Sequence, residues 1–121
     1  MSCYIKWGDE FGDPAYYFDG QYLRANDEFG DYLYHFDGNY IRETDEFGAR
    51  LYHWDGRYLR DGDEFGQSLY YFAHPYAKIY DEFGEYAFHF DGYYLREGDE
   101  FGEKLFYFTG DIPIPILLLI Y

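Results

Sequence analysis

The tetrapeptide Asp-Glu-Phe-Gly returns every 18 residues, and this regularity constrains the fold more than any other feature of the chain. It occurs six times, at 9–12, 27–30, 45–48, 63–66, 81–84 and 99–102. Residues 1–110 therefore form a predicted six-repeat β array, with repeats at 3–20, 21–38, 39–56, 57–74, 75–92 and 93–110. Such periods are typical of architectures in which neighbouring units together bury a continuous core.

Each repeat contains two short segments rich in Tyr, Phe, Leu and Ile, which predict β-strands. Asp-Gly joins the second segment of one repeat to the first segment of the next, as at Asp37-Gly38. Asp-Gly between β-prone segments is a strong hairpin signal, because a type I′ turn needs positive φ at both central residues. The other connection is the loop that contains Asp-Glu-Phe-Gly. Its Gly is expected in a left-handed conformation, and its Phe is expected to fold back and anchor the loop.

A two-residue Asp-Gly turn predicts which side chains share a face of the sheet. With Asp37-Gly38 as the turn, His35 pairs with Tyr40, and paired residues lie on one face. Leu33 falls on that same face. The opposite face is apolar in every repeat and is the predicted core, made of Tyr16, Tyr34, Tyr52, Tyr70, Phe88 and Phe106; Phe18, Phe36, Trp54, Phe72, Phe90 and Phe108; and Leu23, Ile41, Leu59 and Leu95.

A sheet that is apolar on one face and half-apolar on the other is not stable as a flat layer in water. We therefore expect an all-β fold of six tandem 18-residue β-hairpin repeats that form a curled or superhelical antiparallel sheet, or a dimer. The alternative is a parallel β-solenoid with 18 residues per coil. The recurring Asp-Gly turns favour hairpins.

Departures from the repeat predict local irregularities. His74-Pro75 replaces an Asp-Gly turn and removes a backbone donor, which predicts a bend or an exposed edge between repeats four and five. Pro14 stands at a strand position, which suits a strand at the edge of a sheet. The apolar residues 111–121 are expected to act as a C-terminal cap over the last core face or as an interaction tail, since repeat arrays need closed ends.

Composition excludes several classes of partner. The chain has 9 Lys and Arg against 24 Asp and Glu, a net charge of −15, which argues against nucleic-acid binding and suits a cationic partner. The aromatic content of 27% predicts a folded chain despite this acidity. No apolar run reaches the roughly 18–20 residues of a membrane span, and no secretory signal is visible, so a cytoplasmic location is the default expectation. Cys3 is the single cysteine, so no internal disulfide is expected.

The motifs of catalysis are missing from the sequence. It contains no Gly-x-Ser-x-Gly, no phosphate-binding loop and no plausible Cys/His pair. Catalysis also requires one asymmetric group of residues, whereas this chain repeats the same residues six times. We therefore predict that the protein is not an enzyme.

The metal-ligand residues do not form a predicted metal site. His35, His53 and His89 occupy equivalent positions, which in an antiparallel array lie two strands apart, roughly 9.5 Å. That spacing is too long for one zinc ion. Six Asp-Glu pairs in loops could bind Ca²⁺, although the EF-hand spacing is absent. The competing interpretation is that these Asp side chains close turns and pair with the column of Arg residues. No cofactor is predicted, with Ca²⁺ as the alternative.

The half-apolar face is the predicted site for a ligand or partner. Rows of Tyr and His beside Arg suit stacking against sugars, cations or protein surfaces. Three functions follow as hypotheses: a structural or protein-interaction module that binds a protein or itself, a glycan- or cation-binding module, and an acidic inhibitor or immunity-type protein for a basic partner. The residues of the predicted face are His35, Tyr40, Arg42, His53, Tyr58, Arg60, His89, Tyr94 and Arg96.

The order Tyr-x-Phe-Asp-Gly, then Leu/Ile-Arg, then Asp-x-x-Gly resembles the tyrosine-aspartate repeats of bacterial RHS-type proteins. The resemblance covers residues 3–110. It implies strand pairs that spiral into a shell around a toxin, but six repeats are too few to enclose anything in that way. The arrangement of hairpins with aromatics is also similar to choline-binding repeats, although the Trp-rich signature of that family is missing. These resemblances imply a hairpin architecture and no functional residue.

Overall fold

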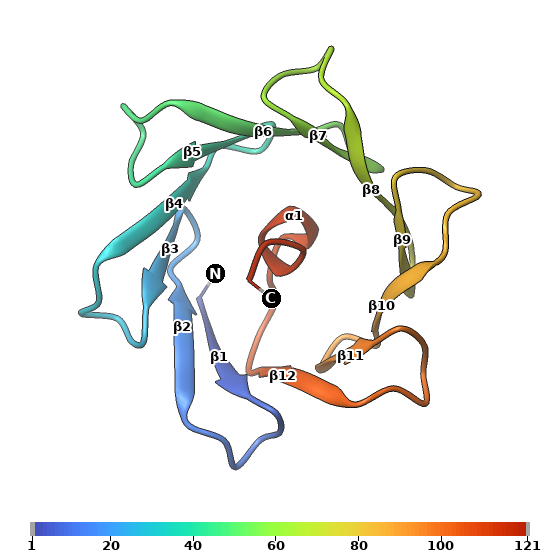
Figure 1. Ribbon diagram of the computed structural model, residues 1–121. Helices are drawn as coiled ribbons and strands as arrows, with labels where there is room; N and C mark the ends of the chain where they lie inside the picture. The colour runs from blue at the N-terminus through green and yellow to red at the C-terminus, as the bar shows by residue number, and fades with distance from the viewer. Residues whose placement is uncertain (1, 121) are drawn as a thin grey trace.

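The computed structural model describes residues 2–120 and contains one sheet of antiparallel strands around a short central helix (Figure 1). Met1 and Tyr121, the outermost residues of the predicted array and tail, lie outside the described residues. The strands are β1 (Cys3–Trp7), β2 (Pro14–Phe18), β3 (Tyr22–Ala25), β4 (Tyr32–Phe36), β5 (Tyr40–Glu43), β6 (Arg50–Trp54), β7 (Tyr58–Asp61), β8 (Ser68–Ala73), β9 (Tyr76–Ile79), β10 (Tyr86–Phe90), β11 (Tyr94–Glu97) and β12 (Lys104–Phe108). The helix α1 covers Ile114–Leu117.

The sheet closes on itself. Each strand pairs with the strands adjacent to it in sequence. The first and last strands, β1 and β12, pair with each other, and Ile5 there lies opposite Phe108. All of these pairings are antiparallel, so the prediction of a curled antiparallel hairpin sheet is confirmed and the chain does not form the parallel solenoid. In Figure 1 the six hairpins radiate from the ring, and the loops that carry Asp-Glu-Phe-Gly point outward as their tips.

Both predictions based on proline were wrong, because closure leaves the described sheet without an open edge. Pro14 lies in β2 opposite Lys6. His74 and Pro75, joined by a cis peptide bond, form a two-residue turn in which Ala73 pairs with Tyr76. The ring therefore continues through repeats four and five without an open edge.

The Asp-Gly turns are longer than the two residues predicted. His35 pairs with Arg42, and Phe36 pairs with Ile41, so the register differs by two residues from the expected one. The Asp37 carboxylate accepts hydrogen bonds from the backbone N–H groups of Asn39 and Tyr40, which stabilises the wider turn. A shift of two residues preserves the face on which each side chain lies.

A β-bulge in each outward hairpin changes the position of one residue per repeat. In the β3–β4 hairpin, Leu23 pairs with Tyr34 and Arg24 pairs with Tyr32, so Leu33 is the extra residue. Leu33 consequently packs against the core, whereas the sequence pattern placed it on the opposite face. The same register shift recurs in all six hairpins that carry the motif.

The core lies inside the ring, where the predicted apolar columns meet the C-terminal tail. Leu23, Ile41, Leu59 and Leu95 are at most 1% exposed. Helix α1 occupies the centre of the ring in Figure 1. The buried residues of the C-terminal tail that contains it are Ile112, Pro115, Ile116, Leu117, Leu118 and Ile120. The expectation that six repeats enclose nothing was wrong, because this ring encloses its own tail. No helix among residues 2–120 is long and apolar enough to cross a membrane.

Candidate functional site

Each Asp-Glu-Phe-Gly loop is a tight turn held by its Asp. In the second repeat the Asp27 carboxylate accepts a hydrogen bond of 2.9 Å from Phe29 N, and Gly30 N donates to Asp27 O at 2.9 Å. Asp side chains commonly close turns in this way. The same contact from carboxylate to Phe N occurs in all six loops.

The Glu of each motif connects its hairpin to the preceding one. Tyr22 Oη donates to Glu46 Oε1 at 2.8 Å, and Tyr94 Oη donates to Glu10 Oε1 at 2.9 Å across the point where the ring closes. The remaining pairs are Tyr4–Glu28, Tyr40–Glu64, Tyr58–Glu82 and Tyr76–Glu100. The hydrogen bond to Glu46 raises the pKa of Tyr22 to about 12, since ionised Tyr would repel the carboxylate. This Tyr–Glu belt runs around the whole ring.

The last position of each motif requires Gly because there is no space for a Cβ. A Cβ on Gly66 would lie 1.6 Å from the carbonyl oxygen of Asp61, and the other five positions give 1.6–1.8 Å. The left-handed conformation predicted for this Gly occurs instead just before the motif, at positions such as Asn26 and Gly62. The sequence therefore correctly predicted that this position requires Gly. The reason is the lack of space for a Cβ, and not a left-handed backbone conformation.

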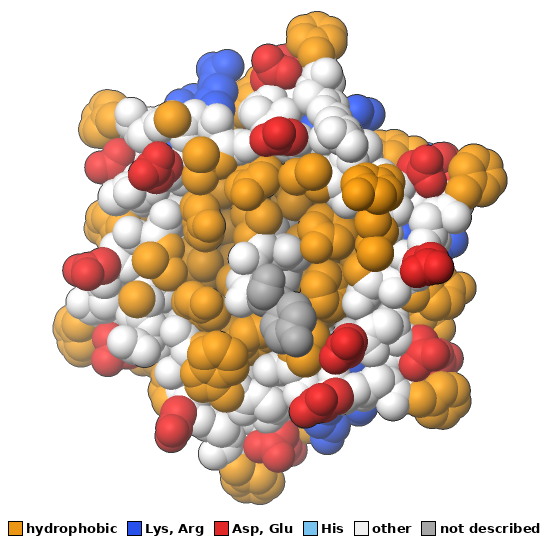
Figure 2. All heavy atoms as spheres, viewed as in Figure 1, with side chains coloured by type: hydrophobic (Ala, Val, Ile, Leu, Met, Phe, Trp, Pro, Cys, Tyr) orange, Lys and Arg blue, Asp and Glu red, His pale blue; other side chains and the backbone are white. Residues whose placement is uncertain are grey.

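The Phe of each motif has no comparable structural contact. The six side chains are 87–90% exposed, and none joins the core cluster of the described residues: Phe11, Phe29, Phe47, Phe65, Phe83 and Phe101. Figure 2 shows apolar rings projecting at the rim of the molecule, with acidic side chains beside them. The expectation that the Phe anchors its loop was wrong, because Asp, Glu and Gly already hold the turn and the Phe extends beyond it. We call this set the phenylalanine crown.

Comparison with known proteins agrees with the six-part ring. The model of a family described as a 6-fold beta flower protein matches residues 5–117, which include all six motifs and α1. The chain belongs to this family. No curated protein and no solved structure matches the chain. The match gives a repeat β family and does not support the RHS-type family in particular.

The half-apolar face predicted as the site lies on the outside of the beta flower. In one group, His35 pairs with Arg42, Tyr40 with His53, and His53 with Arg60. Tyr58 belongs to the same strip, opposite Tyr71 on β8. The second group, on β10 and β11, brings His89 beside Arg96, with Tyr94 next to it opposite Tyr107. The predicted residues thus form two separate strips.

The Arg and Tyr side chains of these strips form hydrogen bonds within the flower. Arg42 Nη1 donates to Gly48 O at 3.3 Å, and its guanidinium lies 3.8 Å from the Asp37 carboxylate. Arg60 and Arg96 donate to the equivalent Gly carbonyls. The Tyr40, Tyr58 and Tyr94 hydroxyls belong to the Tyr–Glu belt. The hydrogen bonds from these Arg side chains to the Gly carbonyls stabilise the Asp-Glu-Phe-Gly loops.

The three His side chains pack as aromatic bodies. The ring centroids of His35 and Tyr22 are 5.0 Å apart, and the His53–Tyr40 and His89–Tyr76 pairs are 5.0 and 5.2 Å apart. Their Nδ1 atoms are buried with no hydrogen-bond partner in the described chain. Among residues 2–120, no three His, Cys, Asp or Glu residues lie close enough to hold a metal ion.

The Asp residues of the Asp-Gly turns illustrate the electrostatics of the outer face. Burial alone would raise the pKa of Asp37, but hydrogen bonds from Tyr40 N and Asn39 N and the charge of Arg42 lower it overall. Asp19, Asp55 and Asp91 behave in the same way. These carboxylates therefore stabilise the Asp-Gly turns and pair with Arg. The Asp residues of the Asp-Glu pairs, for which both roles were predicted, close their turns, but the Arg partners belong to the Asp-Gly residues.

Sequence reasoning missed the phenylalanine crown as a site because it expected each motif Phe to fold back and anchor its own loop. A signal was present in the sequence: the Phe stands between Glu and Gly in a loop, outside the alternating pattern of the strands. A side chain on the inner face of a strand packs against the core, whereas a side chain at the tip of a tight turn has no second layer to pack against.

Proposed function

We propose that the chain is a non-enzymatic β-repeat module that binds protein partners through its phenylalanine crown. The observation that carries this proposal is the 87–90% exposure of Phe at the same motif position in all six repeats. Large exposed apolar side chains at the tips of loops are characteristic of interaction sites.

The variation around the motif supports a selected role for the Phe. The residue before the motif differs between repeats, as in Asn26, Thr44 and Tyr80, and the residue after it includes Asp13, Ala49 and Gln67 among others. These neighbours have diverged while the exposed Phe has not. Asp, Glu and Gly are retained because they hold the turn, but the stability of the loop gives no comparable reason to retain Phe.

The chemistry of the tips indicates the kind of partner. Each Phe directly follows a Glu and stands two residues after an Asp, and the chain carries a net charge of −15. A partner that buries the ring would therefore need an apolar pocket with Lys or Arg at its rim. Six equivalent tips also allow multivalent binding, in which linked weak contacts raise the apparent affinity by about 10²–10⁴. The hypothesis of an acidic inhibitor likewise requires a partner with a basic surface.

The half-apolar face is a weaker candidate for glycan or cation binding. Its Arg and Tyr side chains already contact loop carbonyls and carboxylates within the ring, as Arg42 does with Gly48 O. A ligand would have to compete with those contacts. The Phe tips require no such rearrangement.

The proposal can be tested with a basic amphipathic peptide of Lys and Leu immobilised densely on a biosensor. The unaltered chain should bind it, and a variant with Phe→Ser at all six tips should bind at least about 100-fold more weakly because avidity is lost. Phe→Leu at the same six positions is the matched control and should retain most of the binding, since the tips stay apolar. Both variants should unfold at the same urea concentration as the unaltered chain.

Variants with two or four Ser tips should show a graded loss of affinity. A Lys/Ser peptide of equal charge measures the purely electrostatic part of the binding. Equal binding of the unaltered chain and the six-Ser variant to the Lys/Leu peptide would contradict the proposal, as would no binding by the unaltered chain.

A further inference from the structure

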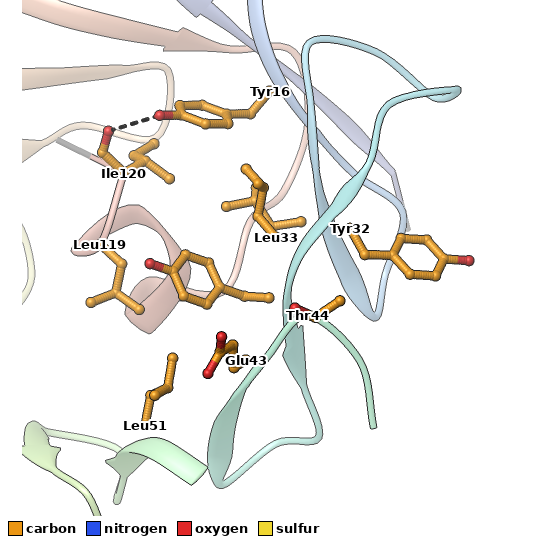
Figure 3. A pocket seen from close by; sticks show the side chains of 10 residues that line it. Tyr16, Tyr32, Leu33, Glu43, Thr44, Leu51, Leu119 and Ile120 are labelled. Carbon is orange, nitrogen blue, oxygen red and sulfur yellow. Dashed lines mark hydrogen bonds between the residues drawn. The ribbon is translucent and has the colours of Figure 1, made fainter. Parts of the chain in front are cut away.

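A pocket of ≈ 520 Å³ opens inside the ring, between the C-terminal tail and the wall formed by β2–β6 (Figure 3). Its volume lies within the range of roughly 300–1,000 Å³ that is usual for sites that bind small molecules. In Figure 3 Leu33 and Leu51 reach toward the cavity from the wall, and Leu119 faces them from the tail. Tyr16 Oη donates to Ile120 O at 3.5 Å, which joins the tail to the wall at one end of the pocket.

The pocket lies on the side of the ring where the wall carries hydroxyl groups. The same inner position holds Tyr in the first four repeats, including Tyr34, but Phe88 and Phe106 in the last two. The two Phe side chains are 7% and 1% exposed, and neither of them lines this pocket. A second pocket, lined by Tyr52 and Tyr70, also lies on the Tyr side. Both of these pockets are therefore lined by Tyr at this inner position, and neither is lined by Phe88 or Phe106.

Glu43 places a negative charge at the rim of the pocket. It pairs with Tyr34 across β4 and β5, so both side chains lie on the inner face of the sheet. Figure 3 shows its carboxylate beside Leu51, and both residues line the pocket. No hydrogen bond or ion pair to this carboxylate occurs among the described residues. The Glu43 charge is close enough to Tyr34 to contribute, after burial and the neighbouring tyrosines, to the raised pKa of that hydroxyl.

We propose that this pocket binds a small organic ammonium compound with an apolar body. The apolar body would lie against Leu33, Leu51 and Leu119, and the ammonium group would pair with the Glu43 carboxylate and with the Tyr34 hydroxyl oxygen. Its lining contains no Lys or Arg, so an anionic head group would find no counter-charge there. The charge of −15 also raises the local concentration of cations around the whole chain.

Three probes of equal chain length separate the contributions of charge and apolar contact: n-octylammonium, n-octanol and octanoate, each below its aggregation concentration. The full chain is titrated with each probe by NMR. Octylammonium should give saturable shifts of the methyl signals of Leu33, Leu51 and Leu119, octanol should bind more weakly, and octanoate should not bind. Octanol binding as tightly as octylammonium would overturn the role of Glu43. Shifts spread over the surface without saturation would overturn the site.

Two substitutions test the assigned contacts against controls that the chain itself provides. Glu43→Gln should weaken octylammonium binding about fivefold, the effect expected for a partly solvated ion pair. Glu97→Gln removes the same charge at the equivalent position, but beside Phe88, and should leave the affinity unchanged. Tyr34→Phe recreates the side chain that repeats five and six tolerate, and should weaken octylammonium without affecting octanol. Equal losses for Glu43→Gln and Glu97→Gln would overturn the proposed position of the ammonium.

Discussion

Two glycines in the fourth repeat, four residues apart, should differ sharply in their tolerance of a side chain. Gly66 ends the Asp-Glu-Phe-Gly motif, and an added Cβ would lie 1.6 Å from the Asp61 oxygen and 2.7 Å from its carbon, where ordinary contact begins at 3.4 Å. Both are backbone atoms at the end of β7, so neither can move without displacing the strand. Gly62 has a φ of +79° and nothing within 4 Å of an added Cβ.

The expected magnitudes follow from these two situations. Forcing atoms into a closely packed site costs about 1–3 kcal/mol and sometimes more, and we expect Gly66→Ala to cost about 3 kcal/mol because the overlap is with backbone. Gly62→Asn should change the free energy of unfolding by about 0.5 kcal/mol or less, since an exposed left-handed position accepts Asn readily. Asn26 already occupies the equivalent position with a φ of 65°.

Urea unfolding, followed by the fluorescence of Trp7, Trp54 and the tyrosines, measures the stability of both variants. Gly66→Ala should lower the unfolding midpoint by roughly 1–3 M, while Gly62→Asn should leave it nearly unchanged. Equal midpoints for the two variants would refute the argument that the motif Gly is required by close approach. A larger loss for Gly62→Asn would show that the left-handed position is the critical one.

Two further predictions concern the Tyr–Glu belt and the tail. The pKa of Tyr22 is raised from 10.0 to about 12 by its hydrogen bond to Glu46, so the stability from this contact is complete below about pH 10 and is lost as the pH rises toward about 12. The difference in urea midpoint between the unaltered chain and Tyr22→Phe should therefore shrink over that interval, and a constant difference up to pH 12 would argue against the belt. Leu117→Ala should destabilise the fold by about 2–5 kcal/mol, because Leu117 is fully buried at the centre of the ring. Thermal unfolding measures this, and a loss below about 1 kcal/mol would mean that the tail does not depend on this contact.

The strands and their core face could be predicted because they depend on local alternation. Ile41 and Phe36 lie on the predicted inner face, and the register difference of two residues did not alter this. Leu33 was misplaced because a bulge adds one residue to the strand, and the sequence carries no separate signal for it. The Asp-Gly turn was predicted too short because the Asp37 side chain can bond N–H groups two and three residues ahead, which stabilises a longer turn.

The exposure of the phenylalanine crown and the inner pocket were not predicted, for a different reason. Composition shows that aromatics are abundant but does not show which of them find a layer to pack against. Phe18 and Phe29 are the same residue type in neighbouring repeats, yet one is fully buried and the other is 87% exposed. The difference arises from their positions, since Phe18 faces into the ring and Phe29 lies at the tip of a loop.

The sequence by itself determined the 18-residue unit, the antiparallel hairpins and the apolar face, because these follow from interactions between residues close together in the chain. The tertiary structure alone decided that six units close into a ring, as in the pairing of Ile5 with Phe108, and that the tail enters that ring. Closure depends on the twist summed over every strand and on contacts between residues about a hundred positions apart, such as Tyr16 with Ile120. No local pattern encodes such a sum, so the ring, its pocket and its outward tips became visible only in three dimensions.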